Sequence, residues 1–228
     1  MDAKVTILYD NTAEESGLET GWGFSAYIEL ESSRARILFD TGWDGGALLH
    51  NMRALGISPE DIDLVVISHN HWDHIGGLPA LLKRLGESTK VLLPSSVSRR
   101  FRDEVRRLRA AEIVEEPAEI EPFGVYTTGS LQSDVVEEQS LVVPLPGKGG
   151  NLVIVGCSHP GLDRIVEASG RFGEIFGILG GMHSFRKFEL LHTVQFFAPL
   201  HCTRYRDVVY GLYPGRVSVK GVGGVYQF

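Results

Sequence analysis

The chain has little of what marks secreted, membrane-spanning or nucleic-acid-binding proteins. Its 228 residues include only two cysteines, Cys157 and Cys202, which cannot build a disulfide framework. No run of about 18 apolar residues occurs, and the start MDAKVTILYD lacks the layout of a signal peptide. A net charge of −7 argues against a general affinity for nucleic acid. These absences predict a cytoplasmic protein with neither a membrane nor a nucleic-acid partner.

Short apolar runs recur along the chain and predict strands. They are VTILY, FSAYIEL, RILFD, LVVIS, KVLLP, VYTT, SLVVP, LVIVG, IFGILGG, FFAPL and VSVKG. Helical patterns lie between several of them, at 45–55, 75–85, 97–109, 162–169, 185–193 and 204–212. Strands come first and then alternate with helices, which predicts an α/β fold whose sheets are covered on the outside by helices. Since no linker or repeat interrupts this order, residues 1–228 are expected to form a single domain.

Three histidines and an aspartate lie within the segment SHNHWDH at 68–74, directly after an apolar run. A tight loop leaving a strand allows such side chains to converge on one point, which a regular strand or helix does not. Neutral imidazoles and a carboxylate are ligands that zinc and its first-row neighbours prefer. The segment therefore predicts a centre for one or two divalent ions, with Zn as the first choice and Mn or Fe as alternatives.

Other residues able to bind metal follow further apolar runs. They are Asp40, Cys157, His159, His183 and His201. Neighbouring strands lie about 4.8 Å apart, so residues at their ends can build one site although they are distant in sequence. The two remaining histidines, His50 and His192, lie within helical patterns, and we interpret them as surface or packing residues.

These motifs resemble those of the metallo-β-lactamase superfamily. FDTG at 39–42, SHNHWDHIGGL at 68–78, GCSHPG at 156–161 and PLHCT at 199–203 follow in the family's order. The opening ILYDNTAEESGLETGWGFSAYIE, LLHNMRALGI at 48–57 and GGMHS at 180–184 are similar to one subgroup, the 7,8-dihydropterin-6-methyl-4-(β-D-ribofuranosyl)aminobenzene-5′-phosphate synthase-like proteins. The resemblance implies a four-layer αββα sandwich with a metal site at the edges of the sheets.

By position, the resemblance also implies the ligands of two ions. Those of the first ion are His69, His71 and His159. Those of the second ion are Asp73, His74 and His201. Asp73 would in addition act as the local general base. Asp40 is expected to orient a ligand imidazole, because a ligating histidine needs its second nitrogen fixed.

The chain departs from the superfamily at the position of an aspartate that bridges the two ions, where LVIVG is followed by Cys157. The Cys157 thiolate could bind metal, a water alone could bridge the ions, or only one ion could bind tightly. His183 is a further candidate, either as a metal ligand or as the acid that protonates the leaving group. The alternatives are buried packing for the cysteines, and a hydrogen bond to backbone for His159 or His183.

The implied reaction is hydrolysis of a small molecule, phosphorylated or related to pterins, by metal-activated water. Trp22 and Trp72 could form a flat wall for a ring-bearing substrate, or could pack in the core. Six arginines between residues 99 and 109 could bind phosphate, although a solvated helix with Arg100–Glu104 and Asp103–Arg107 pairs is favoured.

Two other functions are compatible with the motifs. The first is a metal-binding sensor or scaffold that performs no turnover, which the missing bridging aspartate favours. The second is a redox protein with bound iron. It is disfavoured because the related diiron flavoproteins carry glutamate at the position of His71, and no flavin domain follows.

Overall fold

The computed structural model describes all residues from 1 to 228. Its strands form two sheets that pack face to face. The first has seven strands in the order β13-β1-β2-β3-β4-β5-β6: β1 (Ala3–Tyr9), β2 (Ser25–Leu30), β3 (Arg36–Phe39), β4 (Leu64–Val66), β5 (Lys90–Leu93), β6 (Ala110–Ile113) and β13 (Val225–Gln227). The second has six in the order β12-β11-β10-β9-β8-β7: β7 (Ala118–Ile120), β8 (Val125–Thr127), β9 (Leu141–Leu145), β10 (Gly150–Val155), β11 (Ile175–Gly181) and β12 (Phe196–Leu200).

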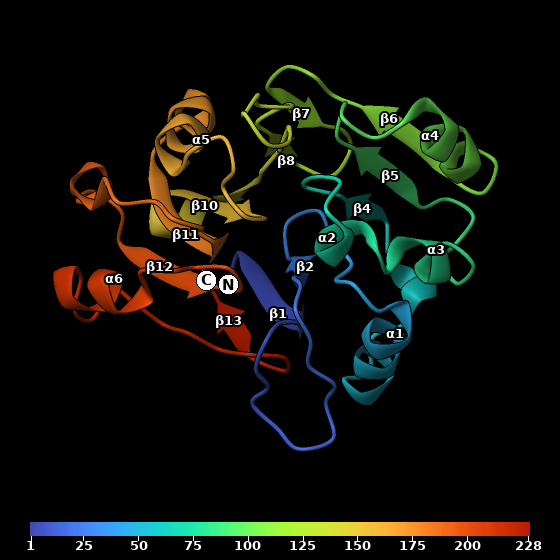
Figure 1. The fold of residues 1–228 in the computed structure, drawn as a ribbon, viewed down its shortest axis with the longest axis horizontal. Coiled ribbons are helices and arrows are strands. Elements are labelled where there is room, and N and C mark those ends of the chain that lie inside the picture. The colour runs from blue at the N-terminus through green and yellow to red at the C-terminus, as the bar shows by residue number, and fades with distance from the viewer.

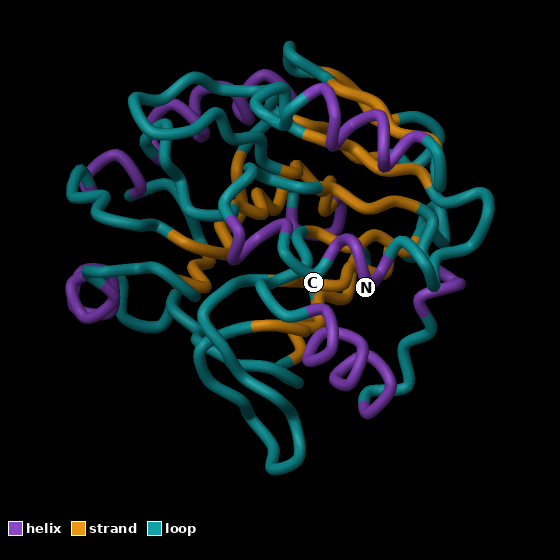
Figure 2. Tube along the Cα trace, turned by 45° about the vertical axis from the view of Figure 1, so that its right-hand side comes forward, coloured by secondary structure: helices purple, strands orange, loops and turns teal.

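Helices cover the outer faces of both sheets (Figures 1 and 2). They are α1 (Gly45–Ala54), α2 (Trp72–Ile75), α3 (Leu78–Leu81), α4 (Arg99–Arg106), α5 (Leu162–Ser169) and α6 (Arg206–Leu212), with 3-10 turns η1 (Pro59–Asp61), η2 (Pro146–Lys148), η3 (Gly170–Phe172) and η4 (Phe188–Leu191). In Figure 1, α1, α3 and α4 lie on the right and α5 and α6 on the left, with the sheets between them. The predicted four-layer αββα sandwich is confirmed. No helix is long and apolar enough to cross a bilayer.

The alternation of side chains along the strands explains the layers. In β3, Ile37 and Phe39 belong to the central core of 26 buried residues, to which both sheets contribute. Leu38 between them belongs instead to the outer core under α1 and α3. In β10, Ile154 is central, whereas Val153 packs under α5. Because side chains point to opposite faces with a period of two, each inner strand supplies two cores.

The strands that the sequence did not predict, β6, β7 and β13, all lie at sheet edges. They have three or four residues each and carry exposed positions, so their apolar pattern is weak. The predicted strand VSVKG is wrong, since Val217 makes only an isolated bridge to Phe197. The predicted helix at 185–193 is also wrong, because only the 3-10 turn η4 forms there.

The predicted helix at 75–85 is replaced by two short helices with Gly76 and Gly77 between them. A Cβ on Gly77 would lie 2.3 Å from the Thr41 carbonyl oxygen, and one on Gly76 would lie 2.5 Å from that of Trp43. The glycines therefore allow this turn to pack against the segment after β3. That contact holds the histidine-rich loop in place.

The strand directions bring the predicted ligands together. β3 and β4 run parallel in the first sheet, and β10, β11 and β12 run parallel in the second. Their carboxyl ends meet at one edge of the sandwich, where the loops at 40–44, 67–74, 156–161, 182–187 and 201–205 begin. Four of the five non-glycine residues with positive φ lie in these loops: Asp40, Ser158, His183 and His201. Backbone conformations of this kind cluster at functional sites.

Candidate metal centre

Three histidines from the two sheets converge at this edge. The rings of His69 and His71 are 4.7 Å apart between centroids, and the His159 ring lies 4.9 Å from His69 and 4.7 Å from His71. One ring nitrogen of each lies within 4.8 Å of the other two. The Nε2 atoms of His69 and His159 are buried and have no hydrogen-bond partner. Buried polar atoms are rarely left without a partner, so this arrangement fits a ligand set for a cation.

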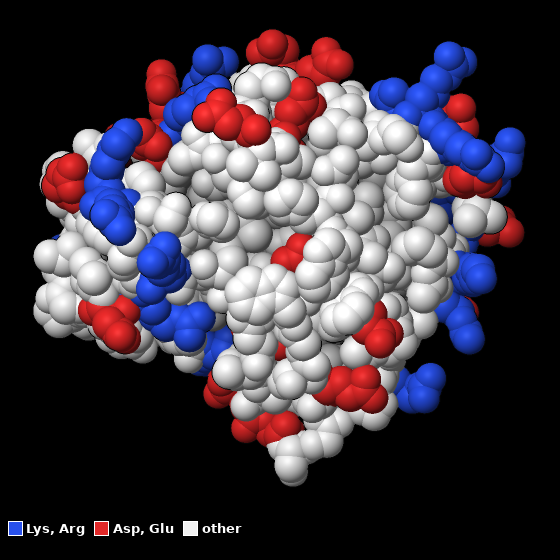
Figure 3. Space-filling model, viewed as in Figure 1, with Lys and Arg blue, Asp and Glu red and all other residues white.

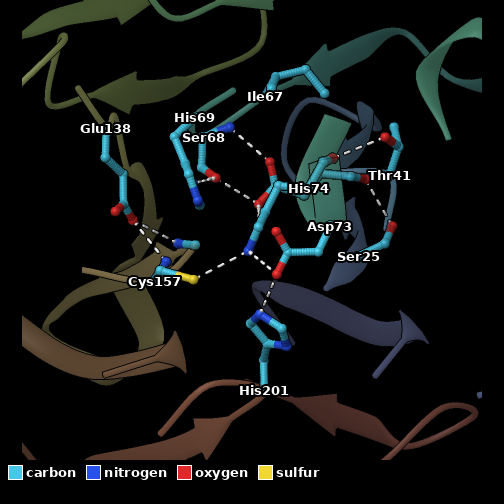
Figure 4. Close-up of polar contacts among 12 residues, drawn as sticks. Ser25, Thr41, Ile67, Ser68, His69, Asp73, His74, Glu138, Cys157 and His201 are labelled. Carbon is cyan, nitrogen blue, oxygen red and sulfur yellow. Dashed lines mark hydrogen bonds and ion pairs between the residues drawn. The ribbon is translucent and has the colours of Figure 1, made fainter. Parts of the chain in front are cut away.

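A second group of donors lies beside the first and centres on His74 (Figure 4). Its Nε2 is 3.2 Å from Cys157 Sγ and 3.8 Å from Asp73 Oδ2, and His201 Nε2 is 3.3 Å from the same carboxylate oxygen. Zinc–ligand distances of about 2.0–2.3 Å correspond to tetrahedron edges of about 3.3–3.8 Å. The three contacts fall near this range. Asp73, His74 and His201 form one set of donor atoms within 4.8 Å of one another, and Cys157 belongs to two neighbouring sets, with His69 and His74 and with His201 and Cys202.

Asp40 fixes the orientation of two of these histidines. Its carboxylate accepts hydrogen bonds from the Ser68 backbone N–H and from the Ser68 hydroxyl, each at 2.7 Å, and contacts His74 Nδ1 at 2.7 Å. Ser68 Oγ in turn lies 2.8 Å from His69 Nδ1. A hydroxyl that donates to Asp40 accepts from His69 Nδ1–H. Both histidines then carry their proton on Nδ1, which leaves the Nε2 lone pairs free for an ion.

Burial keeps most of these histidines neutral. It lowers the pKa of His69 well below the usual range, and the neighbouring His74 and His159 lower it further. Burial together with the nearby His71 lowers the pKa of His159 to about 4. Burial also lowers the pKa of His201, although Asp73 opposes it. Neutral imidazoles are the form that binds metal, so little proton release is needed at neutral pH.

Two buried carboxylates that the sequence did not single out, Glu138 and Asp10, support the loops that carry the candidate ligands. Glu138 is fully buried and accepts backbone N–H groups from residues 156–159 at 2.8–3.1 Å, which holds the loop that carries Cys157 and His159. Burial raises its pKa, although those donors oppose the effect. Asp10 accepts the His201 backbone N–H at 3.3 Å, and burial raises its pKa to about 6. Asp10 directly follows the apolar run VTILY, the signal that singled out Asp40, whereas Glu138 follows none of the predicted strands. Nothing in the sequence separates Glu138 from the partly exposed Glu137 beside it.

A cavity of about 280 Å³ opens over both donor groups. It is lined by Trp22, His71, Trp72, Asp73, Cys157, His159, His183, His201 and Cys202. Figure 3 shows this hollow near the centre of the face, with an acidic side chain inside it and basic side chains along the side of α6. Trp22 and Trp72 are 51% and 52% exposed, so the alternative that they pack in the core is wrong.

Other predicted residues lie at the rim of the cavity or away from it. His183 is exposed at the rim, with its ring 5.1 Å from His159, and belongs to neither donor group. His50 and His192 contact backbone carbonyl oxygens at the surface, as predicted. The arginine-rich α4 lines no part of the cavity. Its ion pairs are Arg99–Asp103 and Glu104–Arg107 instead of the predicted pairs.

Comparison with known proteins decides the family. The profile of the metallo-β-lactamase superfamily matches residues 20–163. The chain belongs to the metallo-β-lactamase superfamily. A relative from Methanocaldococcus jannaschii, 7,8-dihydropterin-6-methyl-4-(β-D-ribofuranosyl)-aminobenzene-5′-phosphate synthase, is 24% identical over 225 residues, covering 78% of this chain and 76% of its own. An uncharacterised protein of the same organism is 28% identical, covering 89% and 91% of the two chains.

Solved structures of the superfamily agree with the fold. A metal-dependent hydrolase of the β-lactamase superfamily superimposes with a TM-score of 0.77 at 26% identity, over 99% of both chains. A metallo-β-lactamase fold protein from Bacillus subtilis gives a TM-score of 0.70 at 15% identity over the whole of both chains. The protein thus has the hydrolase fold of this superfamily, which implies binding of a divalent metal.

Proposed function

We propose that this protein is a hydrolase that uses two divalent ions, most suitably Zn, to cleave a small phosphorylated or pterin-related molecule. The observation that carries the proposal is the pair of adjacent donor groups, whose buried ring nitrogens face one another across a small space. His69 Nε2 and His159 Nε2 are buried without a hydrogen-bond partner, and His201 Nε2 has only its 3.3 Å contact with Asp73 Oδ2. A cation would satisfy each of them.

The two groups would hold different kinds of site. His69, His71 and His159 would bind the first ion through three neutral imidazoles, which leaves a position open as in catalytic zinc sites. The second ion would be held by Asp73, His74, His201 and Cys157. Cys157 thereby stands in for the absent aspartate. A thiolate favours zinc or iron over the harder Mn, so the cysteine also bears on the choice of metal.

When bound, such an ion lowers the pKa of a coordinated water to about 7 and polarises a phosphoryl or carbonyl oxygen. Side chains of the protein would accept and donate the protons. Burial raises the pKa of Asp73, but contacts to His201 and His74 outweigh it, so the carboxylate is ionised and can accept a proton. His183, exposed at the rim of the cavity, is our candidate for the acid that protonates the leaving group.

The surroundings of the cavity support an anionic, ring-bearing substrate. The side chains of Trp22 and Trp72 offer apolar faces to a ring. Arg186 donates to the Tyr205 hydroxyl, and the guanidinium groups of Arg186 and Arg204 lie 4.8 Å and 5.6 Å from the centre of the Tyr205 ring.

The ion pairs of the structure include neither Arg186 nor Arg204, although Nε and Nη2 of Arg186 already donate to the Tyr205 hydroxyl. Both arginines sit in the loops that also carry His183 and His201, two residues that line the cavity. Guanidinium groups bind phosphate through two parallel hydrogen bonds. The pterin-related part of the proposal rests on the name of the 24% identical relative.

The test is a double variant, His69→Ala with His71→Ala. We expect it to lose the first ion, measured by elemental analysis, and at least about 100-fold of its phosphodiesterase turnover with bis(p-nitrophenyl) phosphate. The matched control is His50→Ala with His192→Ala, which removes two surface histidines. Undiminished metal and activity in the first variant would refute the proposal.

A second function, a metal-binding sensor or scaffold without turnover, is favoured by Cys157 at the position of the bridging aspartate. A four-ligand site closed by a thiolate resembles structural zinc sites, which have no open position. Screening the metal-loaded protein with phosphodiesters, lactones and thioesters separates the two functions. Full metal content without any hydrolysis would favour the sensor.

A further inference from the structure

The only two cysteines of the chain meet at the edge of the second donor group. Cys157 follows β10 and Cys202 follows β12, and their Sγ atoms are 3.2 Å apart. The strand between them, β11, ends in Gly181. A Cβ on Gly181 would lie 2.6 Å from Cys202 Sγ and 3.2 Å from Cys157 Cα. Only glycine at this position lets the two thiols come into contact across the middle strand.

The two sulfurs differ in their surroundings. Cys157 is buried, and its Sγ lies 3.2 Å from His74 Nε2, so it faces the second donor group. Cys202 is partly exposed and lies behind Cys157. Both line the cavity, so a small reagent that enters the cavity reaches them. Cys157 is a proposed ligand of the second ion, and neither thiol takes part in the proton transfers proposed for Asp73 and His183.

We propose that Cys157 and Cys202 are an oxidative modification site, in which a reversible disulfide withdraws the Cys157 sulfur from the second ion and releases that ion. The inference rests on the proposed function in one respect, the role of Cys157 as a ligand. A disulfide needs the sulfurs at about 2.05 Å, a movement of roughly 1 Å from their present separation.

The oxidant is a hydroperoxide. The more exposed Cys202 sulfur, as thiolate, attacks one peroxide oxygen, and the O–O bond breaks to give a Cys202 sulfenic acid. Cys157 sulfur then attacks the Cys202 sulfur, which forms the S–S bond and expels the hydroxyl as water. Two thiols lose two electrons and two protons, and hydrogen peroxide is reduced to two waters. A dithiol reductant reverses the change by exchange.

The experiment treats metal-loaded protein with hydrogen peroxide at equimolar amount. We expect the intact mass to fall by two hydrogens, two free thiols to disappear, and one ion to appear on a chromogenic chelator, with all three reversed by dithiothreitol and added metal. Cys202→Ser is the matched control, because it keeps Cys157 and all the proposed ligands but cannot form the bond. Its release of metal should be at least about tenfold slower; Cys202→Ala provides a second control should the serine variant fold poorly.

Three outcomes would overturn the inference. Retention of both thiols in the treated wild type would exclude the disulfide. Equal release from Cys202→Ser would show that the ion leaves without it. Loss of an ion from untreated Cys202→Ser would make Cys202 itself a ligand. Disulfide formation in a protein that binds no metal is a different result. It would refute both the proposed function and the release of an ion, and only the pairing of the two thiols would stand.

Discussion

Replacing Asp40 by asparagine tests how the chain prepares its histidines for metal. Asparagine has nearly the same shape and tolerates the left-handed backbone at this position, where φ is 58°. The substitution therefore changes hydrogen-bond donors and acceptors and little else. One carboxylate oxygen becomes an NH₂ group that can only donate.

Each orientation of the new amide conflicts with the site. With NH₂ toward His74 Nδ1, that nitrogen must accept, so the His74 proton moves to Nε2, the atom that faces Cys157. Ser68 Oγ would then accept from the amide and donate to His69 Nδ1, which moves the second proton in the same way. With the amide reversed, NH₂ faces the Ser68 backbone N–H, now 2.7 Å from the carboxylate. An unsatisfied buried donor costs about 1–3 kcal/mol.

Asp40→Asn should therefore weaken metal binding by about 10–100-fold, the usual effect of removing a partner that orients a ligand. This corresponds to about 1.4–2.8 kcal/mol. Competition with a chromogenic chelator measures the affinity. Asp44→Asn is the control, because Asp44 also accepts two backbone N–H groups, at the start of α1, but lies outside the donor groups. Wild-type affinity in Asp40→Asn, with its fold intact by circular dichroism, would refute the tautomer argument.

Three further predictions concern the pH dependence of stability, the buried Glu138, and the arginines Arg186 and Arg204 in the loops that carry His183 and His201. The pKa of His159 is lowered to about 4, so as the pH falls below 6.5 the unfolded chain takes up this proton before the folded chain does. The metal-free protein should therefore lose stability between pH 7 and 4.5, by about 1 kcal/mol from this residue because solvent screens the partly exposed ring. In His159→Asn, the free energy of unfolding measured with urea should fall by that much less over the same pH range. Glu138→Gln places an NH₂ group against backbone donors and should lower the free energy of unfolding by about 1–3 kcal/mol. Arg186→Ala with Arg204→Ala should weaken inhibition by pyrophosphate at least about tenfold, with metal content unchanged.

Each of these has a result that contradicts it. An unchanged pH profile in the His159 variant would mean that its ring is not kept neutral by the fold. Wild-type stability of Glu138→Gln would mean that its hydrogen bonds do not hold the 156–159 loop. For Arg186 and Arg204 the control is Arg99→Ala with Arg100→Ala on α4, which removes the same charge away from the cavity. Equal weakening of pyrophosphate inhibition in both double variants would show that the loss of net charge alone causes the effect.

The sequence predicted the parts of the fold that are buried on one or both faces. β3 and β10 stand out because their apolar residues are consecutive and long enough to be recognised. The edge strands β6, β7 and β13 do not, because half-exposed residues dilute the pattern and pairing with a neighbour decides their conformation. The break at Gly76 and Gly77 was missed for a similar reason, since it depends on the approach of a distant segment.

The candidate site was likewise predicted only in part. The histidine-rich loop is visible in sequence because its donors are adjacent. The contact between Cys157 and Cys202, and the support that Glu138 and Asp10 give to ligand loops, depend on strands that are neighbours only in the folded sheet. No local pattern encodes such pairings. They follow from the strand order β12-β11-β10 and from the glycine at 181.

The most direct test of the account is the number and position of bound ions, measured by elemental analysis together with anomalous scattering from crystals of the zinc-loaded protein. We expect two ions per chain, one among His69, His71 and His159, and one among Asp73, His74, His201 and Cys157. A single ion, or two ions with Cys157 turned away from both, would contradict the role assigned to the cysteine. Absence of any ion at these residues would contradict the account as a whole.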